Sequence, residues 1–214
     1  MEHGLKGRRV AILATDGVEQ VELEDPRRAL DAAGAVTHLI SPKQDSIQAM
    51  NHDEKGARIP VDRLLGDVRP GDYDALLLPG GVANPDQLRT DEKAVQFVRE
   101  FMLADKPVAA ICHGAWMLVE AGAVQGRTLT SWPSLQTDIR NAGGEWVDEA
   151  VRVDDRLITS RKPSDLPQFC AMIVREFAQR MDESRADSMG EQSFPASDPP
   201  PGPSAIGGEG AARG

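Results

Sequence analysis

The feature that most constrains the fold of this chain is the regular alternation of short apolar runs with helical patterns. The runs "RRVAILAT", "VTHLIS", "YDALLLPGG" and "KPVAAIC" are apolar on both faces, which is typical of buried parallel strands. Segments such as "TDEKAVQFVREFMLAD" have apolar residues at helical spacing. This alternation predicts an α/β fold, a doubly wound and mostly parallel sheet with helices on both faces. Ligands bind beyond the carboxyl ends of the strands in such sheets.

The composition changes sharply near Met181 and suggests a domain boundary there. Before it, the last helical pattern runs from Ser164 to Arg180. After it, the chain is rich in Pro, Gly, Ser and acidic residues and holds too few large apolar side chains to offset the entropy of ordering. We therefore predict one domain over residues 1–181 and a disordered tail over residues 182–214, either solvated and without chemistry or a weak partner-binding segment.

Charge and composition exclude several classes of protein. The 24 basic and 34 acidic residues give a net charge of -10, which disfavours nucleic acid as a partner because phosphate binding needs clustered Lys and Arg. No apolar run is long enough for a signal-peptide core or a membrane span. Two cysteines fit a reducing compartment, and the four histidines show no metal-ligand spacing. We expect a cytoplasmic protein without metal, cofactor or membrane partner.

The stretch "KPVAAICHGAW" places Cys112 where a strand turns into a helix. A nucleophile elbow needs small neighbours, and Ala110 and Gly114 supply them. The N-terminal end of the following helix favours the thiolate, which is the reactive form. The alternative is that Cys112 is a small buried hydrophobic residue. Cys170 lies in the apolar helical stretch "LPQFCAMIVREF" and is predicted to be packing.

Two other predicted strand ends carry groups that suit the same chemistry. The turn "PGG" presents the N–H groups of Gly80 and Gly81, which with the N–H of His113 would form an oxyanion pocket, although a simple tight turn is the alternative. After the first strand come Glu19 and Glu22. A carboxyl close to a thiol stays protonated and donates a hydrogen bond, or acts as general acid and base, whereas acids at a helix N-terminus are also favoured by the dipole alone.

The side chain of His113 would need an orienting carboxylate to act as a base, because its neighbour in sequence, Cys112, does not by itself fix the direction of the imidazole. Asp86 is one candidate for that carboxylate.

The segments "ILATDGVEQVEL", "LLPGGVANPDQLRTDEKAVQFVREF", "KPVAAICHGAWMLVEAG", "TLTSWPSLQTDIRNAGGEWVDE" and "TSRKPSDLP" resemble the PfpI family of intracellular proteases and general stress proteins. This group belongs to the superfamily of the parkinsonism-associated protein deglycase, on the class I glutamine-amidotransferase-like fold. The resemblance spans Arg8 to Phe177. It implies a flavodoxin-like sandwich with Cys112 as nucleophile, followed by His113. The family's acidic neighbour of the cysteine maps onto Glu22, with Glu19 as the fallback.

The chain departs from the family pattern at two positions. Protease-like members pair the histidine with a Glu from a neighbouring subunit, and the nearest position here is Asp86, whose side chain is shorter. Many members carry Pro where this chain has Ala115, which affects helix entry more than chemistry. The resemblance also implies a homo-oligomer.

Three functions are consistent with these residues. The first is a cysteine-dependent stress-response enzyme acting on methylglyoxal, glyoxal or their early adducts on proteins, as a deglycase or glyoxalase. The second is an intracellular cysteine peptidase, and the third is a redox-sensing or chaperone-like stress protein in which Cys112 is oxidised beside Glu22. Glutamine amide transfer is disfavoured because no histidine follows His113.

Overall fold

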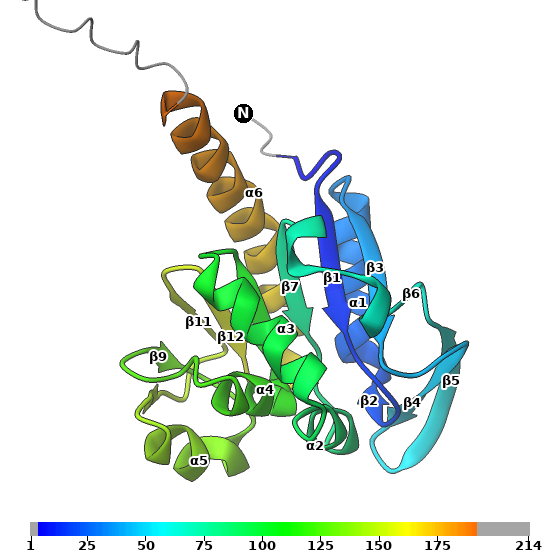
Figure 1. Ribbon diagram of the computed structural model, residues 1–214. Coiled ribbons are helices and arrows are strands. Elements are labelled where there is room, and N and C mark those ends of the chain that lie inside the picture. The colour runs from blue at the N-terminus through cyan, green and yellow to red at the C-terminus, as the bar shows by residue number, and fades with distance from the viewer. Residues whose placement is uncertain (1–3, 192–214) are drawn as a thin grey trace, which may run out of the picture.

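The computed structural model describes residues 4–191, with residues 181–191 as backbone only (Figure 1). Its centre is a seven-stranded sheet in the order β11-β12-β8-β7-β1-β3-β6. Every neighbouring pair in this sheet is parallel except β11 and β12, which are antiparallel. In chain order the strands of this sheet are β1 (Arg9–Leu13), β3 (Val36–Ser41), β6 (Arg63–Leu64), β7 (Ala75–Leu78), β8 (Val108–Ile111), β11 (Val151–Asp154) and β12 (Leu157–Ser160).

Helices cover both faces of this sheet. In the view of Figure 1, α3 lies in front of the strands and α1 and α6 lie behind them. Alternate residues of a strand point to opposite faces, so Val10 and Ile12 of β1 pack in the core shared with α1 and α6. Ala11 and Leu13 pack in the core shared with α3 and α4. The helices are α1 (Gln20–Ala32), α2 (Ala83–Leu88), α3 (Glu92–Leu103), α4 (Ala115–Glu120), α5 (Gln136–Asn141) and α6 (Leu166–Glu191). The predicted α/β sandwich, flavodoxin-like with a mostly parallel sheet, is confirmed.

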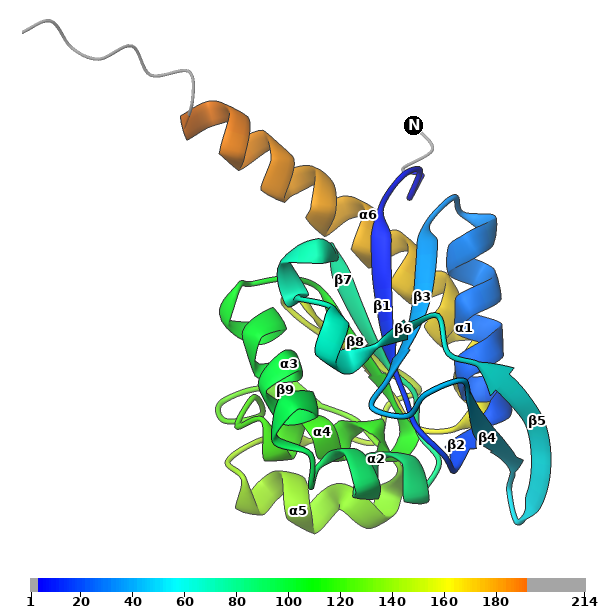
Figure 2. The same ribbon diagram turned by 45° about the vertical axis from the view of Figure 1, so that its right-hand side comes forward.

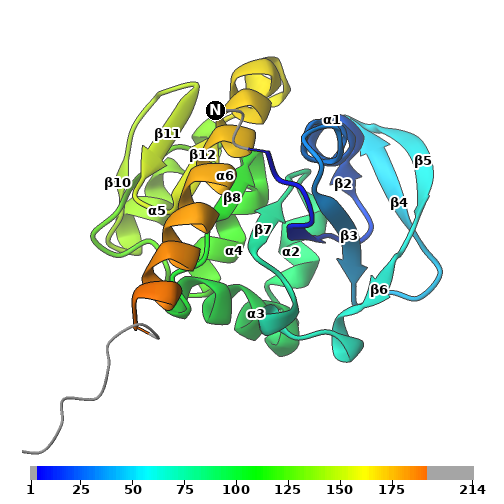
Figure 3. The same cartoon turned by 90° about the horizontal axis from the view of Figure 1, so that it is seen from above.

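Two small sheets flank the central one. A hairpin of β4 (Ser46–Asn51) and β5 (Glu54–Pro60) pairs with the short strand β2 (Val18–Glu19), and β9 (Thr128–Leu129) pairs with β10 (Glu145–Trp146). Seen from above, the hairpin lies at one edge of the molecule and β10 at the opposite edge (Figure 3). The sequence analysis assigned no structure to the hairpin. It lies near the carboxyl end of β1, which points toward β2 and α2 (Figure 2).

The last helix ends later than the sequence analysis predicted. It spans Leu166–Glu191 after a 3-10 turn at Pro163–Asp165, whereas the prediction ended it at Arg180. Residues such as Glu, Arg, Ala and Met after that point favour helix, and extending an existing helix needs no new nucleation. The remainder of the predicted tail, residues 192–214, lies outside the described residues. Over residues 4–191 the structure contains no helix with the length and apolar character to cross a membrane.

Phe101 and Leu103 of α3 provide a matched test of the core. Phe101 is fully buried, whereas Leu103 is 78% exposed. We expect Phe101→Ala to lower the free energy of unfolding by about 3–5 kcal/mol, because it removes a large side chain and leaves a cavity. Leu103→Ala in the same helix should change it by no more than about 0.5 kcal/mol. Urea unfolding measures both, and equal losses would contradict the assigned packing of α3.

Candidate active site

A pocket of about 470 Å³ opens where three loops meet. These loops follow β1, β7 and β8, which are neighbours in the sheet, so their carboxyl ends lie at one edge. The pocket is lined by Glu22, Gly81, Cys112 and His113 among others. A larger groove of about 970 Å³ beside α3 has neither cysteine nor histidine among its described lining residues. The smaller pocket is therefore the candidate active site, at the edge of the sheet where the sequence analysis expected it.

Cys112 stands on a strained turn. It directly follows β8, begins a 3-10 turn that ends at Gly114, and has a φ of 60°, in the left-handed region that few residues other than glycine adopt. A Cβ added at Gly114 would lie 2.3 Å from the carbonyl oxygen of Leu78. Close contact with β7 therefore leaves no room for a side chain at Gly114, the small residue that an elbow needs after its nucleophile.

The side chain of Glu22 lies against the thiol of Cys112. It is fully buried in the first turn of α1, and its Oε2 accepts a hydrogen bond of 3.0 Å from the N–H of Gly80. Its Oε1 is buried without a hydrogen-bond partner among the described residues, and the carboxyl group as a whole interacts with the thiol of Cys112. Burial, together with the charge of Glu19, raises the pKa of Glu22 to about 8, although hydrogen bonds from Cys112 and the Gly80–Gly81 backbone oppose the rise. Glu22 is therefore protonated at neutral pH.

Glu19, the fallback residue, has a different environment. It is buried, and its Oε2 accepts a hydrogen bond of 3.1 Å from the backbone N–H of His52, at the tip of the β4–β5 hairpin. Its carboxylate lines the same pocket. The structure therefore places Glu22 beside the sulfur and joins Glu19 to the tip of the hairpin.

The ionisation of Cys112 differs from the expectation of a favoured thiolate. The residue is 7% exposed, and burial and then the charge of Glu22 raise the pKa of its thiol. The backbone N–H groups of His113 and Gly81 act in the opposite direction but do not prevail. The helix that follows, α4, has only six residues and begins three residues after Cys112, so its dipole contributes little. The resting residue is a neutral thiol.

His113 faces the sulfur although it is the next residue in the chain. Its Nδ1 lies 3.3 Å from Sγ of Cys112. Its ring is stacked on Trp132 at 5.8 Å between centroids and meets Trp116 edge-on at 5.1 Å. Burial lowers the pKa of His113, so the ring is neutral at pH 7. These aromatic contacts fix the ring where the sequence analysis expected a carboxylate to do so.

Asp86 does not join this group within one chain. It lies on α2 with its side chain exposed, and it is absent from the described lining of the pocket. Among the described residues, His113 has no carboxylate partner. A role for Asp86 therefore requires a neighbouring subunit, as the resemblance implied, and stays a prediction.

Of the three N–H groups predicted to bind an oxyanion, one is already occupied by a protein side chain. The N–H of Gly80 is occupied by the carboxyl of Glu22. The N–H groups of Gly81 and His113 are directed at the sulfur of Cys112 and remain the candidates for an oxyanion. Gly81 has a φ of 76°, and a Cβ there would lie 2.2 Å from the carbonyl oxygen of Gly17, so only glycine fits.

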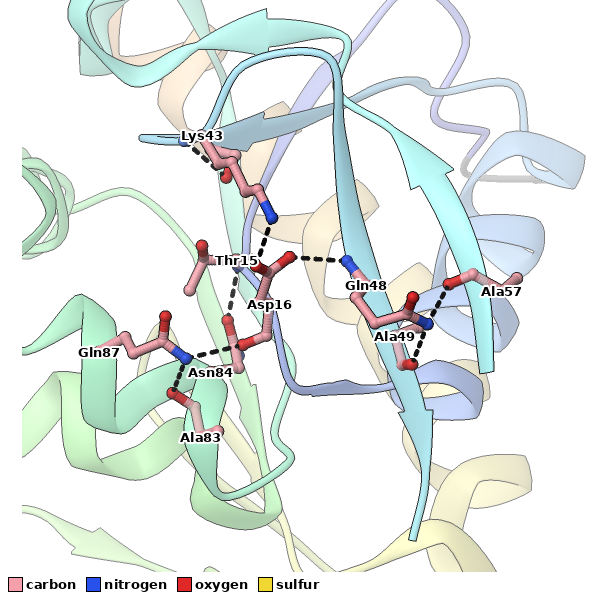
Figure 4. Close-up of polar contacts among 10 residues, drawn as sticks. Thr15, Asp16, Lys43, Gln48, Ala49, Ala57, Ala83, Asn84 and Gln87 are labelled. Atoms are coloured by element: carbon pink, nitrogen blue, oxygen red, sulfur yellow. Dashed lines mark hydrogen bonds and ion pairs between the residues drawn. The ribbon is translucent and has the colours of Figure 1, made fainter. Parts of the chain in front are cut away.

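Sequence reasoning missed Asn84, which connects two of the three loops. Its buried side chain accepts a hydrogen bond of 2.8 Å from the N–H of Thr15 and donates bonds of 3.0 Å to the carbonyl oxygens of Pro79 and Gly80. Figure 4 shows Asn84 beside Thr15 and a second set of contacts around Asp16. The only signal was an Asn in the first turn of a helix, where its side chain prefers to bond nearby backbone.

Asp16 fixes the loop after β1 to the β4–β5 hairpin. Its Oδ1 accepts a hydrogen bond of 2.7 Å from the N–H of Gln48, and Lys43 forms an ion pair with it (Figure 4). The side chain of Gln87, on α2, donates to the carbonyl oxygen of Asp16. Both sides of the pocket are therefore anchored to the same loop. Over the described residues, no three His, Cys, Asp or Glu side chains are grouped to hold a metal ion.

Comparison with known proteins agrees with this architecture. Residues 8–176 match the DJ-1/PfpI family. The chain belongs to the DJ-1/PfpI family. General stress protein 18 of Bacillus subtilis is 40% identical over 164 residues, covering 76% of this chain and 94% of that relative. Protein/nucleic acid deglycase 2 of Escherichia coli is 39% identical over 163 residues, covering 76% and 93%.

Solved structures of the DJ-1/PfpI family share this fold. A two-domain protein from Anabaena variabilis with DJ-1/ThiJ/PfpI-like and ferritin-like domains superposes with a TM-score of 0.74 at 33% identity, over 78% of this chain and 48% of that one. Drosophila melanogaster DJ-1beta superposes with a TM-score of 0.73 at 24% identity, over 86% and 98%. The resemblance to the PfpI family drawn from sequence is therefore confirmed.

Gly80→Ala should disrupt the site. Its added Cβ would lie 2.3 Å from Oε2 of Glu22 and 2.7 Å from Cβ of Cys112, distances that force these groups apart. We expect a loss of stability of about 2–4 kcal/mol by urea unfolding, as for other overpacked cores. Gly71→Ala, where nothing lies within 4 Å of the added atom, is the control and should be nearly neutral. Equal behaviour of the two variants would refute the tight contact.

Glu22 should make stability depend on pH. Between its ordinary pKa of 4.5 and its folded pKa of about 8, the folded state keeps a proton that the unfolded state has lost. The free energy of unfolding therefore falls as pH rises through this window, by at most about 1.4 kcal/mol per pH unit. Glu22→Gln is neutral throughout and should lose that slope. Urea unfolding from about pH 5 to about pH 8 tests this, and parallel profiles would contradict a protonated Glu22.

Proposed function

We propose that this chain is a cysteine-dependent stress-response enzyme that acts on reactive carbonyl compounds, namely methylglyoxal, glyoxal or their early adducts on proteins. The observation that carries the proposal is the full burial of the Glu22 carboxyl against the thiol of Cys112, which raises the pKa of Glu22 and favours its protonated form. Relatives named as a general stress protein and as a protein/nucleic acid deglycase support it.

The neutral forms of Cys112 and Glu22 suit addition to an aldehyde. The sulfur forms a bond to the carbonyl carbon, and the π electrons of the C=O bond move to the oxygen. Glu22 gives its proton to that oxygen and takes up the thiol proton, which its unpartnered Oε1 is placed to exchange. The product is a hemithioacetal, and no standing thiolate is needed, consistent with the raised pKa of the thiol.

Later steps need only water. For an α-oxoaldehyde, the C–H hydrogen of the former aldehyde carbon moves as a proton to the neighbouring carbonyl carbon, and the hydroxyl proton moves to the oxygen on that neighbouring carbon. These two transfers convert the hemithioacetal into a thioester. Water then hydrolyses the thioester to a 2-hydroxy acid and the free thiol. The N–H groups of Gly81 and His113 are the donors that suit the oxyanion of this hydrolysis.

Two observations rank the other functions below this one. A peptidase needs a histidine that is readily protonated to serve the leaving amine, and burial lowers the pKa of His113 while the described chain offers it no carboxylate. A redox sensor needs an accessible thiolate, and Cys112 is a buried thiol whose pKa is raised.

Assembly and location remain predictions of a homo-oligomer in the cytoplasm. Val82 and Trp132 are apolar side chains beside the pocket that are 58% and 37% exposed, and exposed apolar groups of this size suit a subunit contact. Such a contact is also what a role for Asp86 requires.

Cys112→Ser should abolish methylglyoxal consumption, with a fall in rate of about a hundredfold or more, because a serine hydroxyl is a much weaker nucleophile. Cys170→Ser, on α6, is the matched control and should keep the wild-type rate. Loss of aldehyde followed by absorbance, with the hydroxy-acid product identified by mass spectrometry, measures both. Unchanged consumption in Cys112→Ser would sink the proposed function, and peptide cleavage without aldehyde turnover would replace it with a peptidase.

A further inference from the structure

The pocket around Cys112 is lined by acidic groups and by no described lysine or arginine. Glu22 lies beside the sulfur, Glu19 lies beyond it, and Asp53 is exposed at the tip of the β4–β5 hairpin on the pocket wall. Because Glu22 keeps its proton at neutral pH, the negative charge of this lining comes from Glu19 and Asp53. A substrate approaching this sulfur therefore meets negative charge.

The basic residues on neighbouring elements are paired with acids or lie outside the pocket lining, and Lys55, exposed on β5 opposite the pocket residue Met50, is one of the latter. Lys43 is paired with Asp16, below the hairpin. Arg161 is held at 2.6 Å by Asp148 and at 2.9 Å by Asp165. Lys162, although next to the pocket residue Pro163, does not itself line the pocket.

The hairpin tip that carries Asp53 is fixed in place. The backbone N–H of His52 donates to Oε2 of Glu19, and His52 has a φ of 56°, an unusual conformation for a residue other than glycine. The β4–β5 hairpin is in turn connected to the loop after β1 through Asp16 and Gln48. Asp53 is therefore a built part of the pocket mouth.

We propose that this pocket selects electrophiles by charge, with Asp53 as the specificity-determining residue at its mouth. Neutral and cationic carbonyl compounds are admitted, and carbonyl compounds that carry a carboxylate or phosphate are disfavoured. This class includes small aldehydes and carbonyl adducts that carry no negative charge. The inference rests on the proposed function for the identity of the reactive thiol and adds the charge class of its substrate.

The expected size of the effect comes from Coulomb's law near a protein surface. Charges within about one Debye length, roughly 10 Å at 0.1 M salt, are not fully screened. Each such charged acid changes the ratio of the rates for a cationic and an anionic reagent by about twofold to fivefold, so Glu19 and Asp53 together give about tenfold.

Charge selection is tested with two thiol reagents of similar size, a cationic aminoethyl and an anionic sulfonatoethyl methanethiosulfonate. Each forms a mixed disulfide with the cysteine and releases methanesulfinate. A Cys170→Ser background leaves Cys112 as the reacting thiol. Mass spectrometry gives the rate at which each reagent modifies Cys112. Each rate is divided by the rate at which the same reagent modifies a small neutral thiol, which removes the reagent's intrinsic reactivity. We expect a cation-to-anion ratio of about tenfold at low salt, falling toward one at high salt.

Variants at the hairpin tip then assign the effect. Asp53→Asn should lower the ratio about twofold to fivefold, and Asp53→Lys should lower it further or reverse it. Asp155→Asn is the matched control, because it removes one exposed acid from the β11–β12 turn, at the opposite edge of the sheet, where Asn also tolerates the left-handed φ of 53°. Three outcomes would overturn the proposal. The cation-to-anion rate ratio could be near one, Asp53→Lys could leave that ratio unchanged, or neither reagent could modify Cys112.

Turnover separates this inference from the proposed function. Methylglyoxal is a neutral α-oxoaldehyde, and 4,5-dioxopentanoate is an α-oxoaldehyde that carries a carboxylate at its far end. We expect methylglyoxal to be consumed about tenfold faster than 4,5-dioxopentanoate at low salt, after each rate is divided by the rate of reaction with a small thiol, and Asp53→Lys to reduce this preference. If neither is consumed while the reagent ratio behaves as expected, the proposed function fails and charge selection stands. If both substrates are consumed at equal rates and Asp53→Lys does not alter those rates, charge selection is overturned and the proposed function stands.

Discussion

The burial of one carboxyl group, that of Glu22, against the thiol of Cys112 is the interaction on which the rest of the site depends. A carboxylate removed from water is strongly disfavoured, so the group keeps its proton, and its pKa rises to about 8. A buried neutral carboxyl still needs partners. The N–H of Gly80 satisfies Oε2, whereas Oε1 is buried without a hydrogen-bond partner among the described residues. The absence of a side chain at Gly80 is what allows this approach, since a Cβ there would lie 2.3 Å from Oε2.

The strained backbone at Cys112 is stable only because the surrounding loops are fixed by hydrogen bonds. A non-glycine residue in the left-handed region costs about 1–3 kcal/mol. Asn84 offsets part of that cost by holding the turn after β7 to the loop after β1, through bonds to Thr15 on one side and to Pro79 and Gly80 on the other. Each of these bonds is buried, so losing a partner would leave an unsatisfied polar group as well as a free loop. Rigidity at the nucleophile therefore originates in residues that do not touch it.

Periodicity in the sequence was enough to predict the central sheet, whereas features decided by long-range packing were not predictable from it. Apolar runs and strand ends were sufficient to place Cys112, Glu22 and the Gly-Gly turn at one edge of a parallel sheet. The state of the thiol was not predictable in this way, because the helix-dipole argument is local whereas burial is set by the whole fold, and α4 is too short to compensate. The contribution of the β4–β5 hairpin was missed for the same reason: His52 and Asp53 reach the pocket through pairing of β4 with β2, which no motif marks.

A thiol that is neutral at rest changes what the site can do. Oxidants and alkylating agents react with thiolates, so a buried thiol whose pKa is raised reacts with them more slowly than an exposed thiolate. An electrophile that accepts a proton as it accepts the sulfur does not need a standing thiolate. An aldehyde oxygen meets that requirement, because Glu22 can protonate it in the same step in which the thiol proton is released. The charge that forms during addition is then shared between oxygen, carboxyl and backbone N–H groups instead of accumulating on sulfur. Under the proposed function, the burial of Cys112 beside Glu22 therefore favours carbonyl carbons whose oxygen takes up a proton as the sulfur adds.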